Sequence, residues 1–313
     1  MTGMSCLVTG GAGFIGSHVA DRLARGGHRV RVVDNLSTGD ERNLAHLAGK
    51  IDFIRGDLTD PTVCRAVVRD VEVIFHLAAL PSVPRSMQDP WASYRHNVEA
   101  TMNLLLAARE AGARRIVYSS SSSVYGDTPT LPKVETMEPL PRSPYAAAKL
   151  SAEQFVLAFA RAGMIEGVAL RYFNVFGPRQ SPTSAYAAVI PVFLAAARDG
   201  RPAPVNGDGL QTRDFTYVDN VVEANILASS RPSAAVSGVA CNVGAGARTS
   251  LMELLQLVGQ VTGRAVTAEH HPARAGDVRD SLASLERSRH VLTYEPLVSL
   301  GEGLRTTWRW VQR

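Results

Sequence analysis

Short apolar runs alternate with longer amphipathic segments through the first half of the chain. The apolar runs predict strands at 4–9, 29–33, 51–55, 72–77, 114–119 and 165–171. Apolar residues spaced three and four apart predict helices near 14–26, 61–69, 91–112 and 144–162. Strands that alternate with helices build a parallel sheet covered on both faces. We therefore expect an α/β fold with a doubly wound parallel sheet, and ligands at the carboxyl ends of its strands.

The second half has a different pattern. A proline-rich polar segment, Gly177 to Thr183, reads as a loop that leaves the sheet. Helices are expected at 187–199, 218–230, 249–262 and 300–311, and short strands near 203–205 and 239–243. We expect residues 1–173, with returns near 213–243, to form the sheet domain. Residues 174–212 and 244–313 are then a smaller, interleaved α/β lobe that binds the substrate.

A glycine-rich turn joins the first strand to the first helix. Gly10, Gly13 and Gly16 follow the strand directly, which is the setting of a Rossmann dinucleotide loop. Glycines let the backbone approach a pyrophosphate, and the helix N-terminus attracts its charge. Asp34 ends the second strand 18 residues after Gly16, where an acid accepts a ribose 2′-hydroxyl. Because no arginine follows Asp34 directly, the sequence favours NAD over NADP.

A second pattern predicts catalysis. Tyr145 and Lys149 are four residues apart on the helix that Ser143 and Pro144 begin, so they share one face. A lysine ammonium favours the phenolate and lowers the pKa of a neighbouring tyrosine. The pair therefore predicts a general base.

Composition and charge narrow the function classes. The 313 residues have a formal net charge of +4, and no basic run exceeds two residues, which argues against nucleic-acid binding. No apolar run reaches the ~18 residues of a membrane span. Cys6, Cys64 and Cys241 are odd in number and lack metal-ligand spacing, so we expect no metal and reduced thiols. The first strand begins at the N-terminus and leaves no room for a signal peptide, so we expect a cytoplasmic protein.

The serine tract Ser119 to Ser123 allows two interpretations. It could be a flexible polar loop. It also closes an apolar strand and precedes Val124-Tyr125-Gly126, so a hydroxyl there could face the Tyr145 helix and hydrogen-bond a substrate. We favour the second interpretation.

Together these motifs resemble the extended short-chain dehydrogenase/reductase family. The resemblance is carried by the glycine loop, Asp34-Asn35-Leu36-Ser37, His76-Leu77-Ala78-Ala79, the serine tract with Val124-Tyr125-Gly126, Tyr145-x-x-x-Lys149 and Arg171-Tyr172-Phe173-Asn174. The later segments are similar to nucleotide-sugar 4-epimerases, most of all UDP-N-acetylglucosamine 4-epimerases. That closer similarity lies in Ser82 to Ser86, Ala185 to Pro191, Gly207-Asp208-Gly209 with Arg213-Asp214-Phe215, and Arg274 to Arg279.

The resemblance implies roles for individual positions. Catalysis is assigned to Ser121, Tyr145 and Lys149. Cofactor contacts are implied for Gly10, Gly13, Phe14, Ile15, Gly16, Asp34, Asn35, Ser37, Gly39, Asp57, Leu58, Leu77, Ala78, Ala79, Asn97, Ser119, Tyr145, Lys149 and Tyr172. Substrate contacts are implied for Val83, Arg85, Ser86, Ser121, Ser122, Ser123, Tyr145, Asn174, Ala188, Val189, Arg213, Arg274, Asp277 and Ser281. Among these, Asn174, Arg213, Arg274 and Asp277 would hold the UDP moiety.

At several positions this chain differs from related enzymes, and these differences reduce the number of activities that we expect. Dehydratases of the family typically carry an acidic pair where this chain has Ser122 and Ser123, and related decarboxylases keep a glutamate at the second position. Val192 replaces an arginine that relatives use for a sugar carboxylate. Ser281 is small where a bulky gatekeeper would crowd an N-acetyl group.

The resemblance thus implies an NAD-dependent UDP-hexose 4-epimerase that works through a 4-keto intermediate on UDP-N-acetylglucosamine and UDP-N-acetylgalactosamine. The alternatives are a UDP-glucose/UDP-galactose 4-epimerase, then a UDP-glucuronate 4-epimerase or a dehydratase. A nucleotide-sensing protein and a dehydrogenase that releases NADH are further possibilities. The family also implies a homodimer built from helices 91–112 and 144–162, which could otherwise pack within one subunit.

Overall fold

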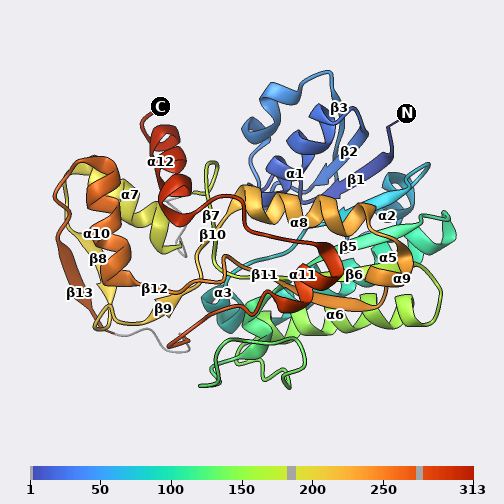
Figure 1. Ribbon diagram of the computed structural model, residues 1–313. Helices are drawn as coiled ribbons and strands as arrows, with labels where there is room; N and C mark the ends of the chain where they lie inside the picture. Colours follow the sequence, from blue (N-terminus) through green and yellow to red (C-terminus); the bar gives the residue numbers. More distant parts are fainter. Residues whose placement is uncertain (1–2, 182–187, 273–277) are drawn as a thin grey trace.

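The central element is a seven-stranded parallel sheet. The computed structural model describes residues 3–181, 188–272 and 278–313 (Figure 1). Its strands are β1 (Ser5–Thr9), β2 (Arg29–Asp34), β3 (Ile51–Arg55), β4 (Val73–His76), β5 (Arg115–Ser121), β6 (Glu166–Tyr172) and β11 (Val239–Val243). Their order is β11-β6-β5-β4-β1-β2-β3, and every neighbouring pair is parallel. The expected doubly wound sheet is confirmed.

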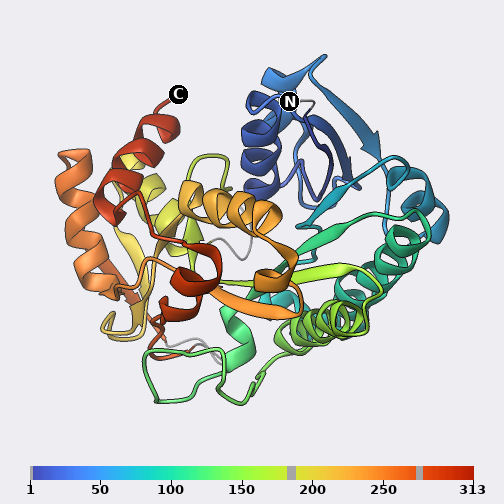
Figure 2. The same cartoon turned by 45° about the vertical axis from the view of Figure 1, so that its right-hand side comes forward.

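Helices cover both faces of the sheet. Cys6, Leu7 and Val8 of β1 are fully buried, because successive side chains of a central strand enter opposite apolar layers. One layer holds α1 (Phe14–Arg25) and α8 (Val218–Ser230). The other holds α2 (Pro61–Val67), α5 (Ala100–Glu110) and α6 (Pro144–Arg161). Figure 2 shows α6 and α8 on opposite sides of the sheet.

A long helix forms where one was expected at 91–112, and a further helix precedes it. The helix α3 (Val83–Gln88) comes first, and α4 (Pro90–Tyr94) follows it. Asp89 accepts a hydrogen bond from the Ala92 amide and Pro90 occupies the first helical position, so a new helix begins there. Residues 95–99 then form a π-helical turn, and α5 continues directly from it. The expected helix is therefore confirmed, with a π-helical turn inside it that the sequence did not predict.

The remaining strands and three helices form a smaller lobe beside the carboxyl edge of the sheet. Here α7 (Val189–Asp199), α10 (Leu251–Thr262) and α12 (Leu300–Val311) pack together, next to β8 (Ala203–Asn206) and β13 (Ala268–His271). The strands β9 (Thr212–Arg213) and β12 (Thr249–Ser250) form an antiparallel pair, and β7 (Val175–Phe176) pairs with β10 (Thr216–Tyr217). Figure 1 shows this lobe at the left of the sheet.

Several short elements were not expected. They include the 3-10 helices η1 (Glu41–Leu47) and η3 (Ser122–Tyr125), the helices α9 (Ser233–Val236) and α11 (Glu286–Leu292), and the strands β7, β9, β10, β12 and β13. Although α11 lies in the range expected for the lobe, it packs on β11 and α8, with Ser288 hydrogen-bonded to the Asn242 carbonyl.

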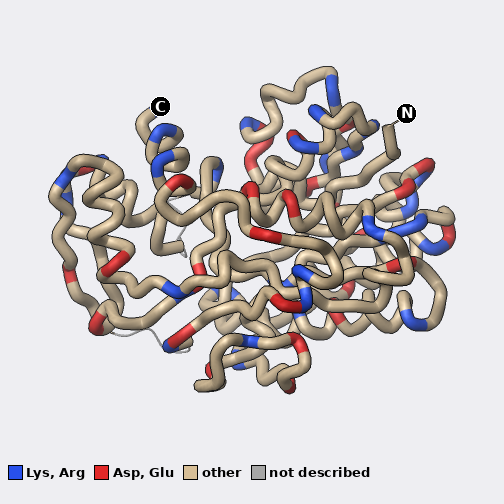
Figure 3. Tube along the Cα trace, viewed as in Figure 1, with Lys and Arg blue, Asp and Glu red and all other residues tan. Residues whose placement is uncertain are grey.

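Charges of both signs are interspersed along the trace (Figure 3). This distribution agrees with the modest net charge of +4. No helix in the described part of the chain has both the length and the apolar character needed to cross a bilayer.

Candidate active site

The glycine turn after β1 is sterically closed to larger residues. Gly10 has φ +64°, and a Cβ there would lie 2.7 Å from the Ala78 backbone. A Cβ on Gly16 would lie 2.2 Å from the Gly10 carbonyl oxygen. Glycine is therefore required for the close approach of the turn to the Ala78 backbone and for the contact between Gly16 and Gly10 within the turn. The turn leaves the N-terminus of α1 facing a cavity, where backbone amides can bind a pyrophosphate.

Asp34 is the last residue of β2, and its side chain hydrogen-bonds the glycine turn. Its Oδ2 accepts a hydrogen bond from the Ala12 amide at 3.0 Å, and its Oδ1 accepts one from the Leu36 amide at 2.8 Å. Burial raises the pKa of Asp34, and the hydrogen bonds from Leu36, Ala12 and Gly13 oppose that shift. Three amides donate to two oxygens that together have about four lone pairs, so the carboxylate can still accept a ribose hydroxyl.

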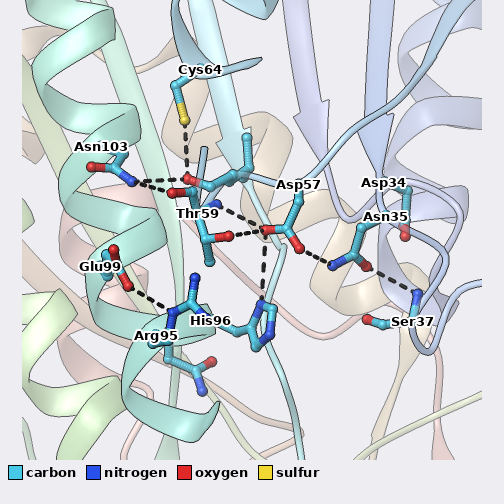
Figure 4. Close-up of polar contacts among 12 residues, drawn as sticks. Asp34, Asn35, Ser37, Asp57, Thr59, Cys64, Arg95, His96, Glu99 and Asn103 are labelled. Carbon is cyan, nitrogen blue, oxygen red and sulfur yellow. Dashed lines mark hydrogen bonds and ion pairs between the residues drawn. The ribbon is translucent and has the colours of Figure 1, made fainter. Parts of the chain in front are cut away.

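A polar network forms the wall beyond Asp34 (Figure 4). Asp57 accepts hydrogen bonds from Asn35 Nδ2 at 2.9 Å and from the amide and hydroxyl of Thr59. Burial acts to raise the pKa of Asp57, but these hydrogen bonds outweigh it and lower the pKa. His96 Nδ1 lies 4.0 Å from the same carboxylate. The wall therefore offers a fixed carboxylate and an imidazole to a bound nucleotide.

These elements enclose a cavity of about 350 Å³ along the carboxyl edge of the sheet. Of the residues expected to contact the cofactor, it is lined by Gly10, Gly13, Phe14, Ile15, Gly16, Asp34, Asn35, Ser37, Asp57, Leu58, Leu77, Ala78, Ala79, Ser119, Tyr145, Lys149 and Tyr172. Gly39 lies behind the lining, since a Cβ there would be 2.9 Å from Asp34 Oδ2. Asn97 is buried and does not line the cavity, and its side-chain oxygen has no hydrogen-bond partner among the described residues. The glycine cradle and the Asp34 carboxylate, which do line it, fit NAD.

The serine tract lies at the end of β5, and three consecutive hydroxyls have separate partners. Ser119 Oγ lies 3.0 Å from the Tyr172 hydroxyl, and Ser120 Oγ donates to Glu153 at 2.5 Å. Ser121 Oγ accepts hydrogen bonds from the amide and hydroxyl of Ser123. The hydroxyl proton of Ser121 is therefore free to form a different hydrogen bond, which it donates to the Tyr145 side chain. The tract is an ordered strand end rather than a loose loop.

Tyr145 lies at the start of α6, as the sequence predicts. Ser143 accepts a hydrogen bond from the Ala146 amide, and Pro144 is the first helical residue. Burial raises the pKa of Tyr145, and the hydrogen bond from Ser121 acts in the opposite direction. The expected lowering of this pKa by Lys149 is therefore not what the structure shows, because burial dominates the balance at the phenol.

Lys149 is buried one turn further along α6. Its Nζ lies 4.5 Å from the centre of the Tyr118 ring. Burial lowers the pKa of Lys149 to about 7, and the charge of Glu153 opposes this. A lysine with this pKa can gain or lose a proton near neutral pH.

Two further cavities continue from Tyr145 into the smaller lobe. One, of about 450 Å³, is lined by Tyr145, Val83, Asn174, Arg213, Ser281 and the serines 121–123. The other, of about 620 Å³, is lined by Asn174, Ala188, Val189 and Arg213, with apolar residues of α7 and β8. Tyr145 borders both the cofactor cavity and the first of these, whereas Asn174 and Arg213 border both lobe cavities. The three cavities therefore form a continuous series, and we call the middle one the sugar cavity.

Some expected substrate residues lie elsewhere or outside the described residues. Arg274 and Asp277 are outside the residues that the structure describes. Arg85 is partly exposed on α3. Ser86 on the same helix is buried, and its hydroxyl donates to the Val83 carbonyl at 2.7 Å. The structure thus does not bring Ser86 to the lining of the sugar cavity.

The sequence interpretation missed several lining residues. His96 and Gln180 border the cofactor cavity, Lys133 and Asp280 border the sugar cavity, and Gln211 and His271 border the largest cavity. His96 adjoins Asn97, which was singled out, so its position offered a weak signal. The other five lie in loops or short strands without a pattern that predicts a site.

Comparison with known proteins agrees with this geometry. The sequence profile of the NAD dependent epimerase/dehydratase family matches residues 6–244. A UDP-glucose 4-epimerase of Mycolicibacterium smegmatis is 41% identical over 308 residues, which cover 97% of each chain. A solved UDP-N-acetylglucosamine 4-epimerase from Methanobrevibacter ruminantium M1, in complex with UDP-N-acetylmuramic acid, has a TM-score of 0.93 at 37% identity, covering 100% of this chain and 99% of its own. A UDP-glucose 4-epimerase from Thermus thermophilus, solved as a complex with NAD, has a TM-score of 0.90 at 34% identity, covering 99% of each chain.

The resemblance inferred from the motifs is therefore confirmed, and so is the dependence on NAD. Residues 6–244 include the glycine turn, the serine tract and the Tyr145–Lys149 pair. The chain is an enzyme that belongs to the NAD dependent epimerase/dehydratase family.

Proposed function

We propose that this protein is a UDP-hexose 4-epimerase that acts on UDP-N-acetylglucosamine and UDP-N-acetylgalactosamine. The observation that carries the proposal is the series of three cavities, with Tyr145 shared by the first two and Arg213 by the last two. A nucleotide in the largest cavity would direct its pyrophosphate toward Arg213, whose planar guanidinium suits phosphate oxygens. The sugar would then lie between Tyr145 and the cofactor cavity.

The chain's own groups can move the proton that the reaction requires. NAD, when bound, would accept the C4 hydride and return it to the other face of the sugar. Tyr145 would take the proton of the C4 hydroxyl and later give it back. Ser121 can donate its hydroxyl proton toward the reacting oxygen, because its lone pairs already accept from Ser123. Lys149 would stabilise the Tyr145 phenolate and hold the nicotinamide ribose.

A 4-epimerase also requires that the sugar turn between the two hydride transfers. Arg213, Asn174, Ala188 and Val189 border the largest cavity, away from Tyr145. Binding energy concentrated on the nucleotide leaves the ring free to present either face.

Water elimination and decarboxylation are less well supported. Ser122 and Ser123 line the sugar cavity but supply hydroxyls rather than carboxylates. Asp280 also lines this cavity, yet its carboxylate accepts a hydrogen bond from Thr212. Val192 borders the largest cavity as an apolar residue, which argues against a dedicated contact for a sugar carboxylate.

The C2 substituent separates the two leading substrate classes. Ser281 is a small buried residue in the lining of the sugar cavity, which leaves space for an N-acetyl group. The alternative is a UDP-glucose/UDP-galactose 4-epimerase, which the 41% identical relative from Mycolicibacterium smegmatis favours.

Product analysis tests the proposal. The purified protein is incubated separately with the UDP derivatives of glucose, galactose, N-acetylglucosamine and glucuronate, and products are separated by chromatography. We expect conversion of UDP-N-acetylglucosamine to its 4-epimer with the highest kcat/KM. A preference for UDP-glucose would favour the alternative, and loss of water or carbon dioxide would contradict epimerisation.

We further propose a homodimer that forms through α4, α5 and α6. Trp91 and Tyr94 on α4 stack on one another yet remain exposed, as do Leu106 on α5 and Phe155 on α6. Large exposed apolar side chains on neighbouring helices are typical of a protein interface. Light scattering of the native protein should give twice the 33.6 kDa chain mass, and Phe155→Asp should give the monomer. A monomeric native protein would contradict this proposal.

We also propose a cytoplasmic location. Cys6, Cys64 and Cys241 are all buried and unpaired, which suits a reducing compartment.

A further inference from the structure

A buried carboxylate lies one helical turn beyond Lys149. Glu153 is fully buried and follows Lys149 by four residues on α6, so the two side chains share one helix face. Ser120 Oγ donates to Glu153 Oε2 at 2.5 Å. Arg171 donates to both carboxylate oxygens, at 3.0 and 2.6 Å. The mechanism above assigns no task to Glu153, although an isolated buried carboxylate would be costly.

We propose that Glu153 is a positioning residue that keeps the Lys149 side chain protonated and aligned beside Tyr145. The inference rests on the proposed function, which gives Lys149 its task at the Tyr145 phenol. Arg171 keeps its positive charge in a protein and donates to both oxygens of Glu153. Ser120 fixes the same carboxylate from β5, next to Ser121. These contacts therefore fix the Glu153 carboxylate on the face of α6 that carries Lys149.

In the part of the chain that the structure describes, Glu153 is the group whose negative charge acts on Lys149. Tyr118 of β5 offers its ring, and Tyr145 lies on α6 itself. His76 of β4 is neutral, because burial and the charge of Lys149 together lower its pKa to about 3. Glu153 is thus the anion that the packed elements bring to Lys149. Burial lowers the pKa of Lys149 to about 7, and Glu153 is the group that opposes this.

The hydrogen bonds of His76 agree with a neutral ring. Thr9 Oγ1 accepts from the Ala78 amide at 3.1 Å and can donate to His76 Nδ1 at 2.7 Å. The other ring nitrogen can then donate to Thr101 Oγ1 at 2.9 Å, while the Thr101 hydroxyl donates to the Asn97 carbonyl. One ring proton satisfies this chain, so His76 does not replace Glu153 as a charge partner.

The chain offers a matched control at the opposite end of the same strands. Arg115 of β5 is buried and bonds Glu166 of β6 at 2.7 Å. Glu166→Gln removes a carboxylate from a buried arginine, as Glu153→Gln does, but far from Lys149. Any general effect of an orphaned arginine should appear in both variants, whereas an effect on Lys149 should appear in only one.

The test is a direct titration of Lys149 by NMR. The chain contains three lysines, Lys50, Lys133 and Lys149, so lysine labelled with ¹³C at Cε gives three assignable signals. In Glu153→Gln, we expect the Lys149 signal to titrate about one pH unit or more below its position in the native protein. The Lys133 signal should not move. Glu166→Gln should leave Lys149 unchanged. An unchanged Lys149 titration in Glu153→Gln would overturn the proposal.

A second comparison covers the case in which Glu153→Gln does not fold. The double variant Glu153→Gln/Arg171→Met removes both charges, so no buried arginine is left without its partner. Lys149 should titrate at lower pH in the double variant than in the native protein, since only the latter keeps the carboxylate. Equal titrations in these two proteins would count against Glu153.

Activity provides the final readout. The alkaline limb of kcat/KM against pH should move to lower pH in Glu153→Gln, and Glu153→Asp should restore part of the loss. If Tyr145→Phe remained active, the proposed function would fail while the NMR result stood. If Tyr145→Phe were inactive and the Lys149 titration did not respond to Glu153, only this inference would fail.

Discussion

The strands β5 and β6 carry a buried arginine near each end of their ladder, and each arginine pairs with a glutamate in different surroundings. At the amino end, Arg115 faces Glu166 across the ladder and donates to the carbonyls of Ala228, Ser229 and Arg231 at the end of α8. At the carboxyl end, Ser120 faces Arg171 in the same ladder, and both bond Glu153 of α6.

The difference indicates that the two buried arginines have different roles. The amino-end arginine joins the sheet to the C-terminus of a helix, where carbonyl oxygens lack partners. The carboxyl-end pair lies behind Ser121, Tyr145 and Lys149, at the edge where parallel sheets bind ligands. Changes at the carboxyl end should therefore alter chemistry, and changes at the amino end should alter stability.

The largest effect is expected for Tyr145→Phe. Removal of the phenolic oxygen should lower kcat by at least ~100-fold, a typical loss for a general acid–base group. The melting temperature should stay near that of the native protein, because the ring is kept. The measurement is the initial rate of UDP-sugar epimerisation, with Tyr94→Phe on the exposed face of α4 as the control. Turnover close to that of the native protein would remove Tyr145 from its proposed role.

Arg115→Met tests the amino end of the comparison. Loss of the ion pair and of three hydrogen bonds to carbonyls should lower the free energy of unfolding by about 3 kcal/mol. The kcat of the folded fraction should remain that of the native protein. Urea titration and an activity assay below the transition measure the two quantities. A stable variant with impaired kcat would reverse the comparison.

Asp34→Ala tests the cofactor half of the carboxyl edge. Loss of the charged acceptor should weaken NAD binding by roughly tenfold or more and reduce the discrimination against NADP. Isothermal titration with both dinucleotides measures the effect. Asp40→Ala, which removes the acceptor for the Arg42 amide in the same loop, controls for loosening of that loop. Unchanged affinities for both dinucleotides would contradict the ribose contact.

The smallest effect is expected for Ser281→Tyr, in the lobe that closes the sugar cavity. A bulky ring should lower kcat/KM for UDP-N-acetylglucosamine at least about fivefold more than for UDP-glucose, because overpacking there acts on the C2 substituent. Ser281→Ala removes the hydroxyl without adding bulk and should leave the ratio unchanged. Equal losses on both substrates in Ser281→Tyr would discount Ser281 as the gatekeeper.

Local chemistry determined those parts of the site that the sequence specifies on its own. The glycine turn, Asp34 at the end of β2, and the Ser143–Pro144 start of α6 each depend on neighbours within a few residues. The apolar runs also identified all seven strands of the sheet, because strands buried on both faces, such as β4, are largely apolar, and the edge strand β3 keeps enough apolar positions to be recognised. These patterns predict the doubly wound fold and the cofactor cavity.

Tertiary structure decided what distant segments do together. Only the parallel register of β5 and β6 brings Ser120 opposite Arg171, and only the packing of α6 on them adds Glu153. Burial, which no motif reports, reversed the expected shift in the pKa of Tyr145. Lys133, Gln211 and His271 reach the substrate cavities from short strands and loops without a periodic pattern. Sequence therefore determined each local element, while long-range pairing and desolvation decided how their side chains act together.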